Sequence, residues 1–137
     1  MITHVFDTSA LLAHFFHEPG AEQVHALLAD NSAEIGLPAL ALLDLKARLT
    51  STVGDAQEAA RAFHLYADEL VTILPVTREI VAKAEAMLGQ PDNPLSLLEA
   101  IVAATAQQEG ALLVHRSRNL ASLHRHHLRQ IVLPLDS

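Results

Sequence analysis

The chain has 137 residues, half of them hydrophobic, and no cysteine. This length is enough to bury a core in a single domain spanning 1–137. The lack of cysteine excludes a disulfide scaffold and thiolate metal sites, and it fits a cytoplasmic protein. No apolar run approaches the roughly 20 residues of a membrane helix, the first residues lack the basic region of a secretory signal, and a net charge of −7 argues against nonspecific coating of nucleic acid.

Apolar runs and breaker residues divide the chain into alternating strands and helices. In chain order, the predicted strands are 2–6, 34–37, 70–74, 111–114 and 131–133, the last of them at a sheet edge. The predicted helices are 8–17, 19–32, 38–49, 56–68, 78–88 and 95–109, followed by a short basic helix after 114. The stretch 89–94, rich in Gly and Pro, is the most obvious loop.

This order predicts an α/β fold. Strands separated by helices of this length form a mostly parallel sheet with helices on both faces, a three-layer α/β/α arrangement. The runs 2–6, 70–74 and 111–114 are continuously apolar, which is typical of strands buried on both faces. No linker marks a second domain.

Three carboxylates are the candidates for a functional site. Asp7 lies where the first strand ends and a helix begins, at the carboxyl edge of the sheet, where open α/β folds place their ligands. Asp44 and Glu99 occupy helix positions from which they can approach the same edge. Converging carboxylates in a chain without cysteine indicate a hard divalent cation such as Mg²⁺, and hence phosphodiester chemistry.

Each acid also has a structural explanation. Asp7 can cap the helix that follows it by accepting hydrogen bonds from first-turn amides. Asp44 can pair with Arg48 one helical turn later. Glu99 forms a capping box with Ser96, in which the glutamate reaches back to the serine amide. Position alone leaves these alternatives open for all three residues.

Basic and histidine residues suggest two further sites. The stretch 116–129 contains no acid and four of the nine basic residues, Arg116, Arg118, Arg125 and Arg129. It is interpreted either as a solvated helix or as a patch that contacts phosphates, with Arg116 and Arg118 just past a strand. Histidines close in sequence, namely His14 with His17 or the set His124, His126 and His127, offer a weaker alternative, a transition-metal site.

Four segments together resemble a known family. They are Val5–Leu12, Leu37–Leu45, Leu95–Ala106 and Gly110–Leu120. In order and spacing they are similar to PIN domains, specifically the VapC-type toxin ribonucleases of bacterial toxin–antitoxin modules. The resemblance covers almost the whole chain.

The resemblance implies a five-stranded parallel sheet and an endoribonuclease that depends on Mg²⁺ or Mn²⁺. The catalytic and metal-binding acids of the family map to Asp7, Asp44 and Glu99. Positions that support the metal site map to three polar residues, Ser9, Ser117 and Asn119. The implied partners are an RNA substrate, an antitoxin protein and a second copy of the chain in a homodimer.

The sequence departs from the family at three of these positions. The second acid, normally glutamate, is Asp44, and the third, normally aspartate, is Glu99. A fourth position, often aspartate, is Ser117 or Asn119. These departures favour an alternative, a catalytically silent PIN-like protein that binds RNA or a partner. A phosphatase with Asp7 as nucleophile is disfavoured, because such enzymes need a second aspartate where this chain has Ser9.

Overall fold

The structure is a computed structural model that describes residues 1–89, 94–123 and 128–135. At its centre is a sheet of five strands in the order β3-β2-β1-β4-β5, with every neighbouring pair parallel. The strands are β1 (His4–Phe6), β2 (Ile35–Pro38), β3 (Thr72–Leu74), β4 (Leu112–His115) and β5 (Gln130–Val132). The prediction of an α/β fold around a five-stranded parallel sheet is confirmed.

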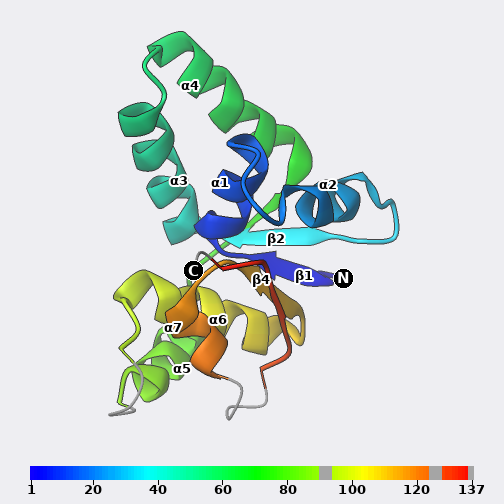
Figure 1. Ribbon diagram of the computed structural model, residues 1–137. Helices are drawn as coiled ribbons and strands as arrows, with labels where there is room; N and C mark the ends of the chain where they lie inside the picture. Colours follow the sequence, from blue (N-terminus) through cyan, green and yellow to red (C-terminus); the bar gives the residue numbers. More distant parts are fainter. Residues whose placement is uncertain (90–93, 124–127, 136–137) are drawn as a thin grey trace.

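Helices cover both faces of this sheet. They are α1 (Thr8–Phe15), α2 (Ala21–Ala29), α3 (Ala39–Thr52), α4 (Ala56–His64), α5 (Arg78–Leu88), α6 (Leu97–Glu109) and α7 (Arg118–Ala121). Helices α1 to α4 lie on one side of the sheet, and α5, α6 and α7 lie on the other (Figure 1). The three-layer arrangement is therefore confirmed. Within the described part of the chain, no helix is long and apolar enough to cross a membrane.

The core is built from small and branched aliphatic side chains. In the central strands, Val5, Phe6, Leu113 and Val114 are fully buried. Helix α6 is buried at every position from Ala100 to Ala106, and it contacts β1, β2 and β4. Because most of these α6 side chains are alanine or valine, the helix lies close against the sheet.

Two predicted elements differ from the structure. The run 70–74 was expected to be buried on both faces, but β3 is an edge strand and Thr72 is exposed. Its apolar residues Ile73 and Leu74 are only half-buried, because an edge strand has a neighbour on one side only. The predicted helix 56–68 is α4 followed by a π-helical turn, η1 (Leu65–Leu70). The prediction of 131–133 as an edge strand is confirmed by β5, although most of the loop 89–94 lies outside the described residues.

The sheet places the carboxyl ends of β1 and β4 side by side. In the parallel register of β1 and β4, Phe6 lies opposite Val114, so the residues that follow the two strands meet at the same edge. Asp7 follows β1, and Arg116 and Ser117 follow β4. The Asp7 amide donates a hydrogen bond to the Val114 carbonyl at 3.0 Å and extends this pairing by one residue.

Candidate active site

Asp7 is a buried carboxylate at the junction of β1 and α1. Its side chain caps α1: Oδ2 accepts hydrogen bonds from the Ser9 amide at 3.1 Å and from the Ser9 hydroxyl at 2.5 Å. The residue is only 6% exposed. Burial raises the pKa of Asp7 above its ordinary value, although the two bonds from Ser9 act in the opposite direction. A carboxylate kept at such an unfavourable position is typical of functional sites.

Glu99 forms the predicted capping box and has two additional partners. Its Oε1 accepts from the Ser96 amide at 3.0 Å, and Ser96 Oγ accepts from the Glu99 amide at 3.0 Å. Its Oε2 accepts from the Ser117 hydroxyl at 2.5 Å, and Asn119 Nδ2 donates to Oε1 at 3.5 Å. Partial burial alone would raise the pKa of Glu99, but these hydrogen bonds outweigh it and lower the pKa.

Asp7 and Glu99 belong to one electrostatic site. The largest influence on the pKa of Asp7 is burial, and the negative charge of Glu99 raises it further. The ring of His115 is buried, and the negative charges of Asp7 and Glu99 both act to raise its pKa. Burial is the stronger effect, and the pKa of His115 is lowered overall. The structure thus brings together two of the three predicted acids.

Asp44 makes the ion pair that the sequence suggested as its structural role. Its Oδ1 lies 3.2 Å from Arg48 Nε, and its side chain is 25% exposed. Helix α3 nevertheless approaches the site, because Thr8 Oγ1 donates to the Ala41 carbonyl at 3.4 Å, one turn before Asp44. Among residues 1–89, 94–123 and 128–135, no three His, Asp or Glu side chains are already placed to hold a metal ion.

The donor chemistry fits a hard cation at two positions and requires a change at the third. Carboxylate oxygens are the ligands that Mg²⁺ prefers, and Asp7 and Glu99 offer them at one edge of the sheet. Asp44 can join them only if its carboxylate leaves Arg48. The pair is solvent-accessible and worth less than about 1 kcal/mol, so the exchange is energetically modest.

The family of the chain is decided by a match along its sequence. The profile of the PIN domain matches residues 4–125. The chain belongs to the PIN-domain family. No protein of curated function matches the sequence.

Solved structures share the fold of this PIN domain at low sequence identity. VapBC2 from Rickettsia felis, bound to a DNA fragment from its promoter, has a TM-score of 0.76 and 13% identity over 97% of this chain and 100% of that chain. VapBC-1 from nontypeable Haemophilus influenzae has a TM-score of 0.72 and 18% identity over 96% and 98%. VapC20 from Mycobacterium tuberculosis, described as a Sarcin-Ricin loop cleaving toxin, has a TM-score of 0.71 and 15% identity over 88% and 94%.

The two arginines predicted to bind RNA differ in their surroundings. The Arg116 side chain is only 11% exposed, since Nε donates to the Pro134 carbonyl at 2.8 Å and Nη1 lies 3.5 Å from Glu18 Oε2. It therefore holds the C-terminal segment of the PIN domain against the α1–α2 connection. Arg118, the first residue of α7, is exposed and lines a pocket of about 360 Å³ together with Asn119. Arg125 lies outside the described residues, and Arg129 donates to the Gly110 carbonyl at 2.9 Å.

His115 and Gln130 are site residues that the sequence analysis missed. His115 is the last residue of β4 and is fully buried. Its Nε2 lies 2.6 Å from Gln130 Oε1 on β5, and its Nδ1 lies 2.9 Å from the Ser117 amide. The sequence did contain a signal: His115 directly follows the predicted strand 111–114 and directly precedes Arg116 and Ser117, which were already candidate site residues.

Of the histidines considered as ligands of a transition metal, only His14 and His17 lie in the part of the PIN domain that the structure describes. His14 Nδ1 lies 2.7 Å from the Tyr66 hydroxyl, and His14 Nε2 lies 3.3 Å from His25 Nδ1. His14, His17, Glu22 and His25 line a pocket of about 250 Å³, but no three of them are placed to share a metal. The set His124, His126 and His127 lies outside the described residues.

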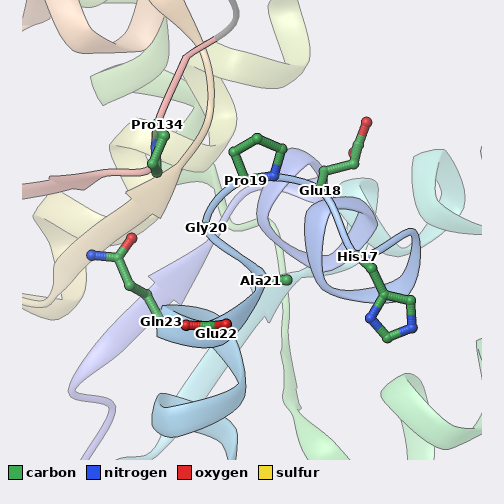
Figure 2. A pocket seen from close by; sticks show the side chains of 8 residues that line it. All are labelled: His17, Glu18, Pro19, Gly20, Ala21, Glu22, Gln23 and Pro134. Carbon is green, nitrogen blue, oxygen red and sulfur yellow. The ribbon is translucent and has the colours of Figure 1, made fainter.

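A larger pocket lies away from the acids. It has a volume of about 670 Å³ and is lined by residues of the α1–α2 connection, the first turn of α2 and Pro134 (Figure 2). None of Asp7, Asp44 and Glu99 lines it. Because Glu18 and Glu22 do, the pocket is unsuited to phosphate.

Proposed function

We propose that this PIN domain is an endoribonuclease that depends on Mg²⁺ or Mn²⁺ and acts as the toxin of a toxin–antitoxin pair. The observation that carries the proposal is the buried carboxylate of Asp7 beside Glu99, each bonded to a serine hydroxyl. Asp7 follows β1, and Glu99 in α6 is bonded to Ser117, which follows β4, so both are near the carboxyl ends of parallel strands, where ligands of open α/β sheets bind. The fold likeness to VapC20, described as a loop-cleaving toxin, supports RNA as the substrate class.

All three acids are proposed ligands of one cation. Asp7 and Glu99 would hold the cation, and Asp44 would be its third carboxylate ligand in place of its pairing with Arg48. When bound, such a cation supplies polarisation of the phosphoryl group and a more acidic water for attack on phosphorus.

The polar neighbours orient these acids. Ser9 donates to Asp7, whereas Ser117 and Asn119 both donate to Glu99. Groups in this position commonly change metal affinity or activity by about 10–100-fold when they are lost. We therefore assign Ser9, Ser117 and Asn119 to the support of the metal ligands.

RNA is expected to approach over α7. Arg118 is exposed there and lines a pocket with Asn119, whose side chain reaches Glu99. A guanidinium at this point can contact a phosphate that flanks the scissile bond. Arg116 contributes less directly, because its side chain is engaged with Pro134 and Glu18.

An antitoxin, a second copy of the chain and a cytoplasmic location complete the proposal. The neighbours from R. felis and H. influenzae are VapBC proteins, which supports an antitoxin partner for this chain. Leu43 is 66% exposed and Leu97 is 72% exposed, on the two helices that carry Asp44 and Glu99. An antitoxin that covers these two helices would bury both side chains, and burial of apolar surface is favourable.

A second candidate function is a silent PIN domain that binds RNA or a partner without cleavage. The pairing of Asp44 with Arg48 favours it, because that pair leaves two carboxylates at the site rather than three. The two candidates differ in metal binding. Calorimetric titration with millimolar Mg²⁺ that shows no binding would support the silent protein.

The deciding experiment is RNA cleavage by the purified protein with Mg²⁺ and with EDTA. The proposal expects cleavage that EDTA abolishes and that Asp7→Asn reduces by more than about 100-fold, beyond the usual cost of losing a supporting group. Asp55→Asn is the matched control, because Asp55 caps α4 in the same way but is exposed. Full metal-dependent activity in Asp7→Asn would remove Asp7 from the mechanism.

A further inference from the structure

One short turn is bonded to Glu99 directly and to Asp7 through Ser9. It is the segment His115-Arg116-Ser117, which links β4 to α7. The Arg116 amide donates to Ser9 Oγ at 2.9 Å, and the Ser117 hydroxyl donates to Glu99 Oε2 at 2.5 Å. The turn therefore carries one of the two serine hydroxyls, that of Ser117, and donates a hydrogen bond to the other, that of Ser9 in α1.

The backbone fixes the direction in which each serine donates its proton. An amide N–H can only donate, so Ser9 Oγ accepts from Arg116 and must direct its own proton elsewhere. The acceptor within reach is Asp7 Oδ2, at 2.5 Å. Ser117 repeats this arrangement, because its Oγ accepts from the Leu120 amide at 3.2 Å and donates to Glu99. Both carboxylates thus receive a hydroxyl donor whose direction a backbone amide sets: the Arg116 amide of the turn for Ser9, and the Leu120 amide of α7 for Ser117.

The same reasoning fixes the tautomer of His115. Its Nδ1 lies 2.9 Å from the Ser117 amide and must accept, so Nδ1 carries no proton. In the neutral ring the proton is then on Nε2, which donates to Gln130 Oε1 at 2.6 Å. The ring is fully buried between β5 and the turn, with both nitrogens occupied.

We infer that His115 is a positioning residue for the acidic pair: its unprotonated Nδ1 holds the Ser117 amide, and the turn so fixed directs Ser117 to Glu99 and Ser9 to Asp7. An aliphatic side chain would fill this buried position without the cost of desolvating an imidazole. The histidine therefore supplies the acceptor Nδ1 for the Ser117 amide. Gln130 accepts the proton on Nε2 and so favours the tautomer in which Nδ1 is unprotonated. The consequence for metal binding rests on the proposed function, whereas the consequence for the turn does not.

Two substitutions separate the nitrogens of His115. In His115→Asn, the side-chain oxygen is as many bonds from Cβ as Nδ1 is, so the acceptor for Ser117 is kept and the donor to Gln130 is lost. In His115→Gln, the terminal amide nitrogen corresponds to Nε2, so the donor is kept and the acceptor for Ser117 is lost. Both variants bury a polar side chain, which makes them matched controls for each other.

The first readout is amide hydrogen exchange at Arg116 and Ser117, measured without metal. We expect exchange about tenfold faster in His115→Gln than in wild type, the scale of one lost hydrogen bond, and near wild type in His115→Asn. The second readout is Mn²⁺ affinity by calorimetry, which we expect to fall about 10–100-fold in His115→Gln and to be largely retained in His115→Asn.

Each outcome decides a separate question. Equal exchange in the two variants overturns the inference, and so does equal Mn²⁺ affinity in the two variants when the wild-type protein binds Mn²⁺. A wild-type protein that binds no Mn²⁺ overturns the proposed function, while the exchange data still decide the role of His115 in the turn. If either variant fails to fold, nitrogen-15 NMR of the wild-type imidazole decides: a proton on Nδ1 in the folded protein contradicts the inference.

Discussion

Ser117 and Glu99 lie 18 residues apart in the chain, yet the serine hydroxyl donates to the glutamate carboxylate at 2.5 Å. This bond joins the turn after β4 to the first turn of α6. It coexists with the capping box that Glu99 makes with Ser96, so a helix cap and a site carboxylate are the same residue. The structural and functional explanations of Glu99 are therefore compatible.

Removing the Ser117 hydroxyl is expected to raise the pKa of Glu99. The hydrogen bond favours the ionised carboxylate, and Ser117→Ala deletes it. Since the folded pKa of Glu99 is lowered, its contribution to stability is present above the unfolded pKa and is lost as the pH falls through the folded pKa. We expect Ser117→Ala to lose about 1 kcal/mol at neutral pH, less than a fully buried bond to a charged group. Urea unfolding and carbon-13 NMR titration measure the two effects.

Ser32→Ala is the control for this change. Ser32 donates to Asp30 Oδ1 at 2.7 Å in an exposed turn, a similar serine–aspartate bond far from Glu99 in sequence. It should leave the pKa of Glu99 and the affinity for Mn²⁺ unchanged. An unaltered Glu99 titration in Ser117→Ala would show that the hydroxyl does not act on this carboxylate.

Neutralising Asp7 is expected to stabilise the fold while it abolishes function. Burial raises the folded pKa of Asp7 above its ordinary value of 3.8, so the contribution of this group to stability falls as the pH rises through that interval. At neutral pH the wild-type protein carries the cost of a buried charge. Asp7→Asn removes the charge and keeps an oxygen that accepts from Ser9, and asparagine caps helices as well as aspartate does.

The measurements for Asp7→Asn are the midpoint of thermal unfolding at neutral pH and Mn²⁺ titration. We expect a midpoint equal to or above that of wild type, together with loss of metal binding. A large drop in the midpoint would mean that the charge of Asp7 is needed for the fold and would contradict this account.

Much of this architecture follows from the sequence. Continuous apolar runs predicted β1 and β4, and the residue after β1 predicted the place of Asp7. The edge position of β3 was not predictable from Leu70–Leu74, because an apolar run does not show how many neighbours a strand has. The role of His115 was also hidden, since it depends on Gln130, which follows it by 15 residues in the chain and lies on a neighbouring strand.

Asp44 shows a different limit of the sequence. The spacing to Arg48 predicted an ion pair, and the approach of α3 to the sheet edge predicted a ligand. The ion pair and the metal site would use the same Asp44 carboxylate. Because an exposed ion pair is weak, the spacing to Arg48 alone does not decide between the two roles.

Releasing Asp44 from Arg48 is expected to strengthen metal binding. Arg48→Gln removes the competing cation, so Mn²⁺ affinity should rise about two- to fivefold, the equivalent of a weak ion pair. The free energy of unfolding should change by no more than about 0.5 kcal/mol. Asp44→Asn should weaken binding, and Arg78→Gln, at an exposed arginine in the first turn of α5, should change neither quantity. Unchanged affinity in both Arg48→Gln and Asp44→Asn would exclude Asp44 as a ligand.

The stability of the protein is expected to fall in mildly acidic solution. Burial lowers the pKa of His4, His14 and His115 below the ordinary value of 6.5. Below pH 6.5 the unfolded chain takes up protons that the folded chain does not. The free energy of unfolding therefore decreases as the pH falls. Urea unfolding at about pH 7.5 and about pH 5.5, roughly one unit on either side of the ordinary histidine pKa, measures the difference.

A variant assigns part of this pH dependence to one ring. His115→Asn should flatten the decrease, because asparagine does not titrate. In Asp7→Asn, where the opposing contribution of the Asp7 carboxyl is absent, stability that rises between neutral and mildly acidic pH would contradict the lowered pKa of these histidines.

The central claim is that Asp7 and Glu99 share one divalent cation at the carboxyl edge of the sheet. The most direct test is the anomalous scattering of Mn²⁺ in crystals of the wild-type protein soaked in millimolar metal. We predict one ion within about 2.0–2.6 Å of carboxylate oxygens from both residues, with Asp44 turned from Arg48 toward it. Ions bound only elsewhere, or none at this edge while Asp7 and Glu99 keep their serine partners, would contradict the account.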